Sequence, residues 1–194
     1  MSSWSRGYLR HIDFEDSVQF ITWRLADSAP KEVIQKYVTD SLAKEKGARL
    51  KFDNELGKGY GSCLLKNYVA AQVMLQELWG PSSVGTDILA FCIMPNHLHV
   101  VVALHDVPLS HWMKGVKGRT ARAINVALGR KGQLWQPDYF DVFIRDEKHL
   151  NAACKYVEWN PVKAGLCVDP RDFAFSSANP VIRDRFQSLR ELSA

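Results

Sequence analysis

Several features that define common protein classes are absent from this 194-residue sequence. No apolar run reaches the roughly 18 residues of a membrane span, so no membrane partner is expected. The first residues contain no apolar core of a secretory signal, and the four cysteines are scattered without a CxxC spacing. We therefore expect a cytoplasmic protein with reduced thiols, without a disulfide framework or a cysteine zinc site.

The composition excludes disorder and fibrous folds. Hydrophobic residues make up 46% and charged residues 24%, which is typical of a globular domain. A Gly-x-Ser-x-Gly elbow, a paired-aspartate motif and a zinc deaminase signature are also missing, which excludes several hydrolase classes. A chain of this length can bury about 70% of its unfolded surface, enough for a full hydrophobic core.

The order of the predicted elements indicates an α+β fold. β-prone runs and helical patterns alternate along residues 17–25, 31–46, 64–79, 88–94, 98–104, 108–128, 139–145 and 147–160. The two central runs, 88–94 and 98–104, are separated by three residues and predict a tight antiparallel hairpin. This order is that of a ferredoxin-like βαββαβ antiparallel sheet with an appended C-terminal helix.

The chain is predicted to form one domain over residues 1–178, followed by a tail over 179–194. Residues 47–62 are rich in glycine and charge, and they predict a loop or mobile arm. The GKGYG sequence within them is not a phosphate-binding loop, because the Walker spacing and its Lys-Ser/Thr ending are absent.

The sharpest chemical feature is His97-Leu98-His99. Residues i and i+2 of a strand share a face, so the two imidazoles can converge on one cation while Leu98 points into the core. Two exposed histidines on an edge hairpin would give the same pattern, and the residues alone leave that alternative open.

A second feature is Tyr156 with Asn160, four residues apart on one face of the last predicted helix. A tyrosine can act as a covalent nucleophile, and Asn160 offers an amide oxygen as a ligand or an orienting group. A core tyrosine and a helix-ending asparagine would produce the same spacing. Tyr139 is the reserve nucleophile.

A third feature is a basic segment. Residues 107–137 contain no Asp or Glu but six cations, which is typical of a polyanion-binding surface. A solvated helix face is the alternative. The candidate polyanion contacts on the predicted helix are Lys114, Lys117, Arg119 and Arg122.

Together these residues resemble a known family. The string FCIMPNHLHVVVAL (residues 91–104) resembles the HUH strand of single-strand DNA transposases that use a catalytic tyrosine. The string DYFDVFIRDEKHLNAACKYVEWNPVKAGL (residues 138–166) resembles the tyrosine helix of the REP-associated tyrosine transposases. Residues 19–28 and 173–178 fit the same family.

The resemblance implies a metal-dependent single-strand DNA endonuclease and strand transferase. It would act on hairpin DNA such as REP palindromes, through a 5′-phosphotyrosine intermediate formed by Tyr156. His97, His99 and Asn160 would bind a divalent cation, Mg²⁺ or Mn²⁺. The basic helix would follow the DNA backbone, and Lys163 is a further phosphate candidate.

Other readings remain open from the sequence. The fold could serve as a hairpin-DNA-binding module with little or no cleavage, or as a metallohydrolase that uses water as its nucleophile. The short Arg145–Asp146 junction favours a monomer with its last helix packed in cis, and a dimer that exchanges this helix is the alternative. No general base for Tyr156 is evident.

Overall fold

The computed structural model describes residues 2–6, 9–13, 16–43, 45, 47–79 and 85–191. Its centre is a four-stranded antiparallel sheet with the strand order β4-β5-β3-β6. These strands are β3 (Ser17–Arg24), β4 (Thr86–Ile93), β5 (His97–Leu104) and β6 (Phe140–Phe143). This is the ferredoxin-like order, so the predicted α+β fold is confirmed. A separate hairpin comprises β1 (Ser2–Arg6) and β2 (Leu9–Asp13).

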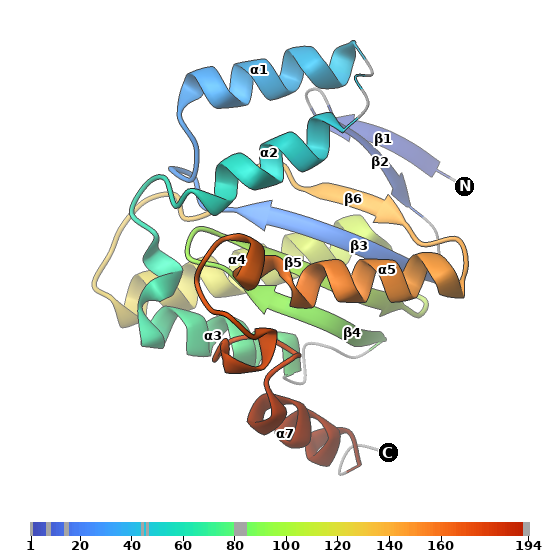
Figure 1. Cartoon of the computed structure of the whole chain (residues 1–194), viewed down its shortest axis with the longest axis vertical. Coiled ribbons are helices and arrows are strands. Elements are labelled where there is room, and N and C mark those ends of the chain that lie inside the picture. Colours follow the sequence, from blue (N-terminus) through green and yellow to red (C-terminus); the bar gives the residue numbers. More distant parts are fainter. Residues whose placement is uncertain are drawn as a thin grey trace.

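The helices divide between the two faces and one edge of the sheet (Figure 1). One face is covered by α3 (Tyr68–Trp79) and α4 (Leu109–Ala127), and the other by α5 (Glu147–Glu158) and the short α6 (Asn160–Lys163). Beyond the β6 edge lie α1 (Lys31–Leu42) and α2 (Ala48–Gly57). None of the described helices is long and apolar enough to cross a bilayer.

The alternation of side chains along β3 and β5 separates the two faces. Ile21, Trp23, Leu98 and Val100 are buried in the core beneath α3 and α4. The residues between them point toward α5, because successive strand residues face opposite ways. The register pairs Thr22 with His99 and Arg24 with His97, which brings four polar side chains onto the α5 face.

The tyrosine helix begins and ends as its sequence predicts. Asp146 is the N-cap of α5, and its Oδ1 accepts a hydrogen bond of 2.7 Å from the backbone N–H of His149. The helix ends at Glu158, and Pro161 sits in the first turn of α6, where its missing N–H costs no hydrogen bond. Asn160 therefore lies at the junction of the two helices.

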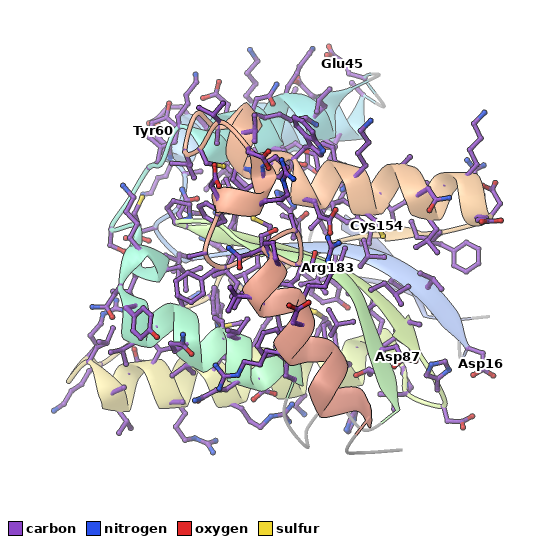
Figure 2. The ribbon with its side chains drawn as sticks, turned by 60° about the horizontal axis from the view of Figure 1, so that its bottom comes forward. Asp16, Glu45, Tyr60, Asp87, Cys154 and Arg183 are labelled. Carbon is purple, nitrogen blue, oxygen red and sulfur yellow. The ribbon has the colours of Figure 1, made fainter. Side chains whose placement is uncertain are left out.

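The prediction of a loop or mobile arm over residues 47–62 is wrong for most of this segment, because residues 48–57 form α2. Phe52 stacks on Tyr37 of α1 with ring centroids 4.3 Å apart, and Leu56 is fully buried. The glycines that suggested a loop lie at the helix ends and in the following turn. Figure 2 shows Glu45 and Tyr60 at the two ends of α2.

The turn after α2 is held in place by polar contacts. Nδ2 of the buried Asn96 donates to the carbonyl oxygens of Leu56 (3.2 Å) and Tyr60 (3.0 Å). Gly61 has φ +79° and passes so close to Asp27 that a Cβ would overlap the Asp27 carbonyl. Only glycine fits this approach.

The predicted tail at residues 179–194 also needs correction. Residues 180–191 form a helix, α7 (Pro180–Glu191), and residues 192–194 lie outside the described part of the chain. Oδ1 of Asn179 accepts a hydrogen bond from the backbone N–H of Val181, which caps the helix. Arg183 connects α7 to α5 through Glu158 at 3.7 Å (Figure 2). The boundary at residue 178 stays a prediction.

Candidate active site

His97 and His99 lie side by side on β5, an interior strand between β4 and β3. Both side chains are fully buried, and their Nε2 atoms are 3.1 Å apart. Leu98 points into the opposite core, as predicted. The alternative of two exposed histidines on an edge hairpin is therefore wrong.

The hydrogen bonds of Asn96 determine which nitrogen of His97 carries the proton. Nδ2 of Asn96 donates to three carbonyl oxygens, those of Ser28, Leu56 and Tyr60. Its Oδ1 must therefore accept the bond of 2.7 Å from Nδ1–H of His97. The Nε2 atom of His97 then presents its lone pair toward His99, as a metal ligand must.

Thr22 gives His99 the same capacity. Its hydroxyl oxygen lies 2.8 Å from Nδ1 of His99 and can accept a hydrogen bond from Nδ1–H, which leaves the Nε2 lone pair for a cation. Burial lowers the pKa of His97 to about 3, with a further contribution from Arg24. Burial, followed by the neighbouring His97, also lowers the pKa of His99 well below its usual value. Both imidazoles are thus neutral at pH 7, the form that binds cations.

The junction of α5 and α6 brings the other two predicted residues to the histidine pair. The Tyr156 ring stands edge-on to His99, with centroids 5.8 Å apart and an interplanar angle of 79°. The side chain of Asn160 is buried and in hydrogen-bond contact with both His99 and Tyr156. The four site residues predicted from the sequence therefore form one cluster.

This cluster suits a divalent cation. No group of three or more His, Cys, Asp or Glu gathers anywhere in the described residues. The donors available are instead two neutral imidazoles and the Asn160 amide, a set with no negative charge of its own. Such ligands would leave a bound cation its full charge for an anionic substrate.

The hydroxyl of Tyr156 donates a hydrogen bond of 2.8 Å to Oδ2 of Asp53, which lies on α2. Asp53 is buried, and its pKa is raised by burial against the opposing effect of Arg49. The pKa of Tyr156 is raised by burial and then by Asp53. The tyrosine is thus protonated, with a carboxylate in position to receive its proton.

Asp53 was missed in the sequence because residues 47–62 were predicted as a loop. A helical signal was present: Phe52 and Leu56 are four apart, and so are Arg49 and Asp53. Read as a helix, this segment places an ion pair beside an apolar stripe. Nothing local, however, reveals that Asp53 meets a tyrosine 103 positions later.

Two cations flank the tyrosine. The Arg49 guanidinium lies 4.1 Å from the Phe20 ring centroid, and its Nε is 3.8 Å from Oδ2 of Asp53. The Lys163 ammonium lies 4.1 Å from the Tyr156 ring centroid. Arg49, Asp53 and Tyr156 also line an open groove of about 360 Å³. An anion placed at the tyrosine would therefore meet positive charge on two sides.

The predicted DNA contacts on α4 lie on the opposite face of the sheet. Nζ of Lys117 donates to the carbonyl oxygens of Gln136 (2.6 Å) and Pro137 (2.8 Å), and Nε of Arg119 donates to Glu77 on α3 (2.7 Å). Lys114 and Arg122 are exposed. The reserve nucleophile Tyr139 is buried in the core on the α4 side. The sheet therefore separates these residues from Tyr156, and their role in DNA binding stays a prediction.

Comparison with known proteins confirms the family resemblance. Residues 75–160 match the model of a family described as "Transposase IS200 like". The matched segment begins within α3 and ends at Asn160, so it contains all four predicted site residues.

Two particular proteins are similar to this chain. A curated protein of Haemophilus influenzae named "Putative REP-associated tyrosine transposase" is 28% identical over 102 residues, and the match covers 47% of this chain. The chain thus spans only 58% of that relative's length. A solved structure, described as a REP-associated tyrosine transposase bound to a REP hairpin, gives a TM-score of 0.56 at 19% identity. That match covers 97% of this chain and 88% of the other, and it shows that the two share a fold.

Proposed function

We propose that this protein is a metal-dependent single-strand DNA endonuclease and strand transferase that acts on hairpin DNA such as REP palindromes. The observation that carries the proposal is the Tyr156 hydroxyl, held by Asp53 beside the buried His97–His99 pair. Support for hairpin DNA as the substrate comes from the family match and from the shared fold with a transposase whose structure contains a REP hairpin.

His97, His99 and Asn160 would hold the divalent cation, Mg²⁺ or Mn²⁺. When bound, the cation would supply Lewis-acid activation of the scissile phosphate and offset its negative charge. Asn96 and Thr22 would keep both histidines in the ligating tautomer. Arg49 and Lys163 would add positive charge on the tyrosine side of the same phosphate.

In the proposed reaction the Tyr156 oxygen attacks the phosphorus and displaces the 3′ oxygen of the preceding nucleotide. The tyrosine proton passes to Asp53, and the departing oxygen takes a proton from water to become a free 3′-hydroxyl. The other DNA fragment stays joined to the protein as a 5′-phosphotyrosine. Because one phosphoester replaces another, a later 3′-hydroxyl can reverse the step and join the strands without ATP.

We propose a monomer as the active form. In this chain α5 packs on its own strands β4 and β5, so the tyrosine reaches the histidine pair without a second copy. The exposed Lys114 and Arg122 of α4 would contact parts of the DNA backbone that lie away from the scissile phosphate.

The test is a covalent-adduct assay. The protein is incubated with end-labelled single-stranded DNA that carries REP hairpins and flanking sequence, with Mn²⁺ or Mg²⁺, and resolved on a denaturing gel. We expect a labelled band shifted by the mass of the protein that is absent with EDTA and in Tyr156→Phe. The matched control Tyr68→Phe should retain the band, since Tyr68 is an exposed residue of α3, on the other face of the sheet.

Two outcomes would overturn the mechanism. Cleaved DNA without an adduct, equally in the wild type and in Tyr156→Phe, would indicate that water is the nucleophile. Hairpin binding without cleavage under either metal would leave a DNA-binding module.

A further inference from the structure

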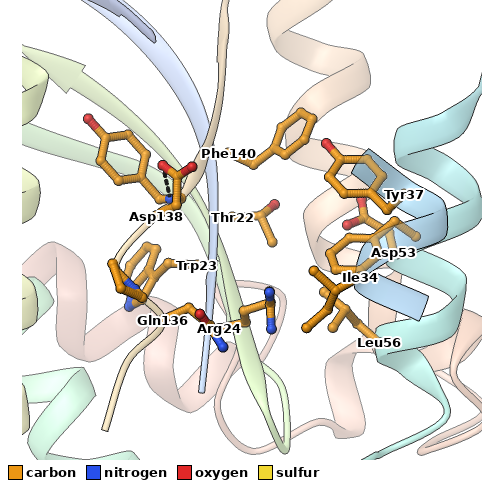
Figure 3. A pocket seen from close by; sticks show the side chains of 13 residues that line it. Thr22, Trp23, Arg24, Ile34, Tyr37, Asp53, Leu56, Gln136, Asp138 and Phe140 are labelled. Carbon is orange, nitrogen blue, oxygen red and sulfur yellow. Dashed lines mark hydrogen bonds between the residues drawn. The ribbon is translucent and has the colours of Figure 1, made fainter. Parts of the chain in front are cut away.

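A second cavity lies beside the catalytic cluster and shares Asp53 with the open groove. We propose that it holds one unpaired nucleobase of the DNA strand, from a nucleotide next to the scissile phosphate. The cavity measures about 380 Å³ and lies between β3 with residues 136–140 and the helices α1 and α2 (Figure 3). This inference rests on the proposed function and adds a substrate contact to it.

The cavity is coupled to the catalytic cluster through its own lining. Thr22 lines it and contacts His99 at 2.8 Å, and Asp53 lines it and accepts the hydrogen bond of Tyr156 at 2.8 Å. A base is joined to its phosphate through a single sugar. A phosphate placed between the histidines and the tyrosine therefore carries its neighbouring base to the mouth of this cavity.

The walls have the chemistry that stacks a flat ring. Tyr37 and Phe52 line the cavity and stack on each other, with centroids 4.3 Å apart and an interplanar angle of 20°, and Phe140 lies 5.8 Å from Tyr37. A base would therefore stack on the ring surface that this pair leaves uncovered. Sites for unpaired bases characteristically combine aromatic faces with a positive charge near the backbone. The cavity volume falls at the small end of the roughly 300–1,000 Å³ of ligand pockets, which suits one base with part of its sugar.

Polar groups on the lining could recognise the edge of a base. Figure 3 shows Arg24, Gln136 and Asp138 on the β3 side, opposite Tyr37 and Leu56. The Arg24 guanidinium lies 5.5 Å from the Phe52 ring centroid, which places donor groups beside the aromatic wall. Arg24 donates to Ser28 at 3.0 Å and Asp138 accepts from the backbone N–H of Tyr139 at 3.0 Å, so a base edge would share these donors and acceptors with their present partners.

Both walls are fixed before any ligand arrives. Nζ of Lys117 binds the carbonyl oxygens of Gln136, Pro137 and Asp138, so this lysine of α4 holds one wall from behind. Nδ2 of Asn96 holds the end of α2 through the Leu56 carbonyl. Ile34 and Gln136 are half-buried and Pro137 is exposed, so the cavity also opens to solvent. A preformed, open pocket loses little free energy to ordering on binding.

The experiment combines an abasic scan with a variant that fills the cavity. Abasic sites are placed one at a time at each nucleotide flanking the scissile phosphate, and cleavage by the full-length protein is measured with Mn²⁺. In the wild type, one position should lower cleavage by about 10-fold or more, the loss of one base–aromatic stack. Ile34→Trp should lower cleavage of the intact strand to that level and abolish the abasic effect at that position.

Matched variants keep the result interpretable. Gln35→Trp places the same bulk on the exposed side of α1 and should behave as the wild type. Ile34→Ala enlarges the cavity and should keep the abasic effect. The same scan is repeated as hairpin affinity in Tyr156→Phe, which separates base binding from the chemical step.

Three results would overturn the inference. In the first, no flanking abasic site lowers cleavage or affinity in the wild type. In the second, the abasic effect persists in Ile34→Trp. In the third, Gln35→Trp loses the abasic effect to the same extent as Ile34→Trp. If cleavage itself proceeds as proposed, these results reject the base pocket alone. A protein that neither binds nor cleaves any hairpin strand rejects the proposed function together with the pocket.

Discussion

The two faces of the central sheet are built from the same strands and differ in chemistry, because the α5 face combines a smaller apolar cluster with the polar groups of the site. On β5, Leu98 and Val100 enter an apolar core beneath α3 and α4, whereas His97 and His99 lie beneath α5. On β3, Trp23 faces the apolar core while its neighbour Thr22 binds His99. A shift of one residue in either strand would exchange the two sets.

The difference separates stability from chemistry. The α3–α4 face buries apolar area at about 25 cal/mol per Å², so it supplies most of the free energy that keeps the chain folded. The α5 face buries imidazoles and a carboxylate whose pKa values are displaced from their ordinary range by desolvation. Burial of such groups opposes folding, so the apolar face holds the site in place.

The largest expected effect comes from neighbouring residues of β5. His99→Leu removes a proposed metal ligand, so cleavage should fall at least about 1,000-fold. Because leucine is apolar and of similar volume, the free energy of unfolding should stay within about 1.5 kcal/mol of the wild type. Leu98→Ala should instead lower the free energy of unfolding by about 2–5 kcal/mol. Adduct yield and urea denaturation measure the two effects.

The contrast would fail if Leu98→Ala lost cleavage while fully folded, or if His99→Leu retained it. A second readout is the melting temperature. Mn²⁺ should raise it in the wild type and in Leu98→Ala, and leave it unchanged in His99→Leu, because a ligand stabilises only the folded state that binds it.

Asp53→Asn gives the next largest effect and tests the contribution of α2. It removes the group placed to accept the Tyr156 proton, so cleavage should fall by about 100-fold while hairpin affinity is retained. Glu55→Gln makes the same change of charge on the same helix, where Glu55 contacts Lys58, and should leave cleavage unchanged. Equal losses in both variants would show that charge on α2, and not the contact with Tyr156, is responsible.

The sheet and the histidine face were predictable because they depend on local patterns. Alternation fixes which face His97, Leu98 and His99 occupy, and the spacing of Tyr156 and Asn160 fixes a common helix face. Local patterns do not show that the tyrosine helix packs over the histidines. That expectation came from the family resemblance. The structure shows that contact directly.

The parts that were missed depend on contacts between distant residues. The glycines near α2 favour a loop locally, and only burial of Phe52 and Leu56 against α1 and the sheet makes the helix the stable state. The basic residues of α4 were grouped by charge alone. The direction in which these side chains point is determined by the apolar residues of α4 that pack on the core. Lys117 therefore contacts the backbone of residues 136–138, and Arg119 contacts Glu77.

The buried histidines should make stability depend on pH. The pKa of His97 falls from about 6.5 in the unfolded chain to about 3 in the folded chain, so below pH 6.5 the unfolded state binds a proton that the folded state does not. In EDTA, the free energy of unfolding should therefore decrease as pH is lowered from 6.5 to 5. The slope from His97 approaches about 1.4 kcal/mol per pH unit, and His99 adds to it.

Urea denaturation at several pH values compares the two faces. Leu98→Ala should give a curve parallel to that of the wild type but lower, whereas His97→Gln should give a shallower one. Equal slopes in the wild type and in His97→Gln would show that His97 is not the source of the pH dependence.

The smallest effects should distinguish the cations of the two faces. Lys163→Gln removes charge beside Tyr156 and should lower cleavage several-fold, up to about 10-fold, and also weaken the salt dependence of hairpin affinity by about one phosphate contact. Lys114→Gln should reduce the salt dependence but not the cleavage rate at saturating DNA, because the sheet separates it from the tyrosine. Arg119→Gln should change neither by more than about 2-fold, since its partner is Glu77 and such surface pairs contribute little. A salt dependence unchanged in Lys114→Gln would remove α4 from the DNA path and leave the strand on the α5 side alone.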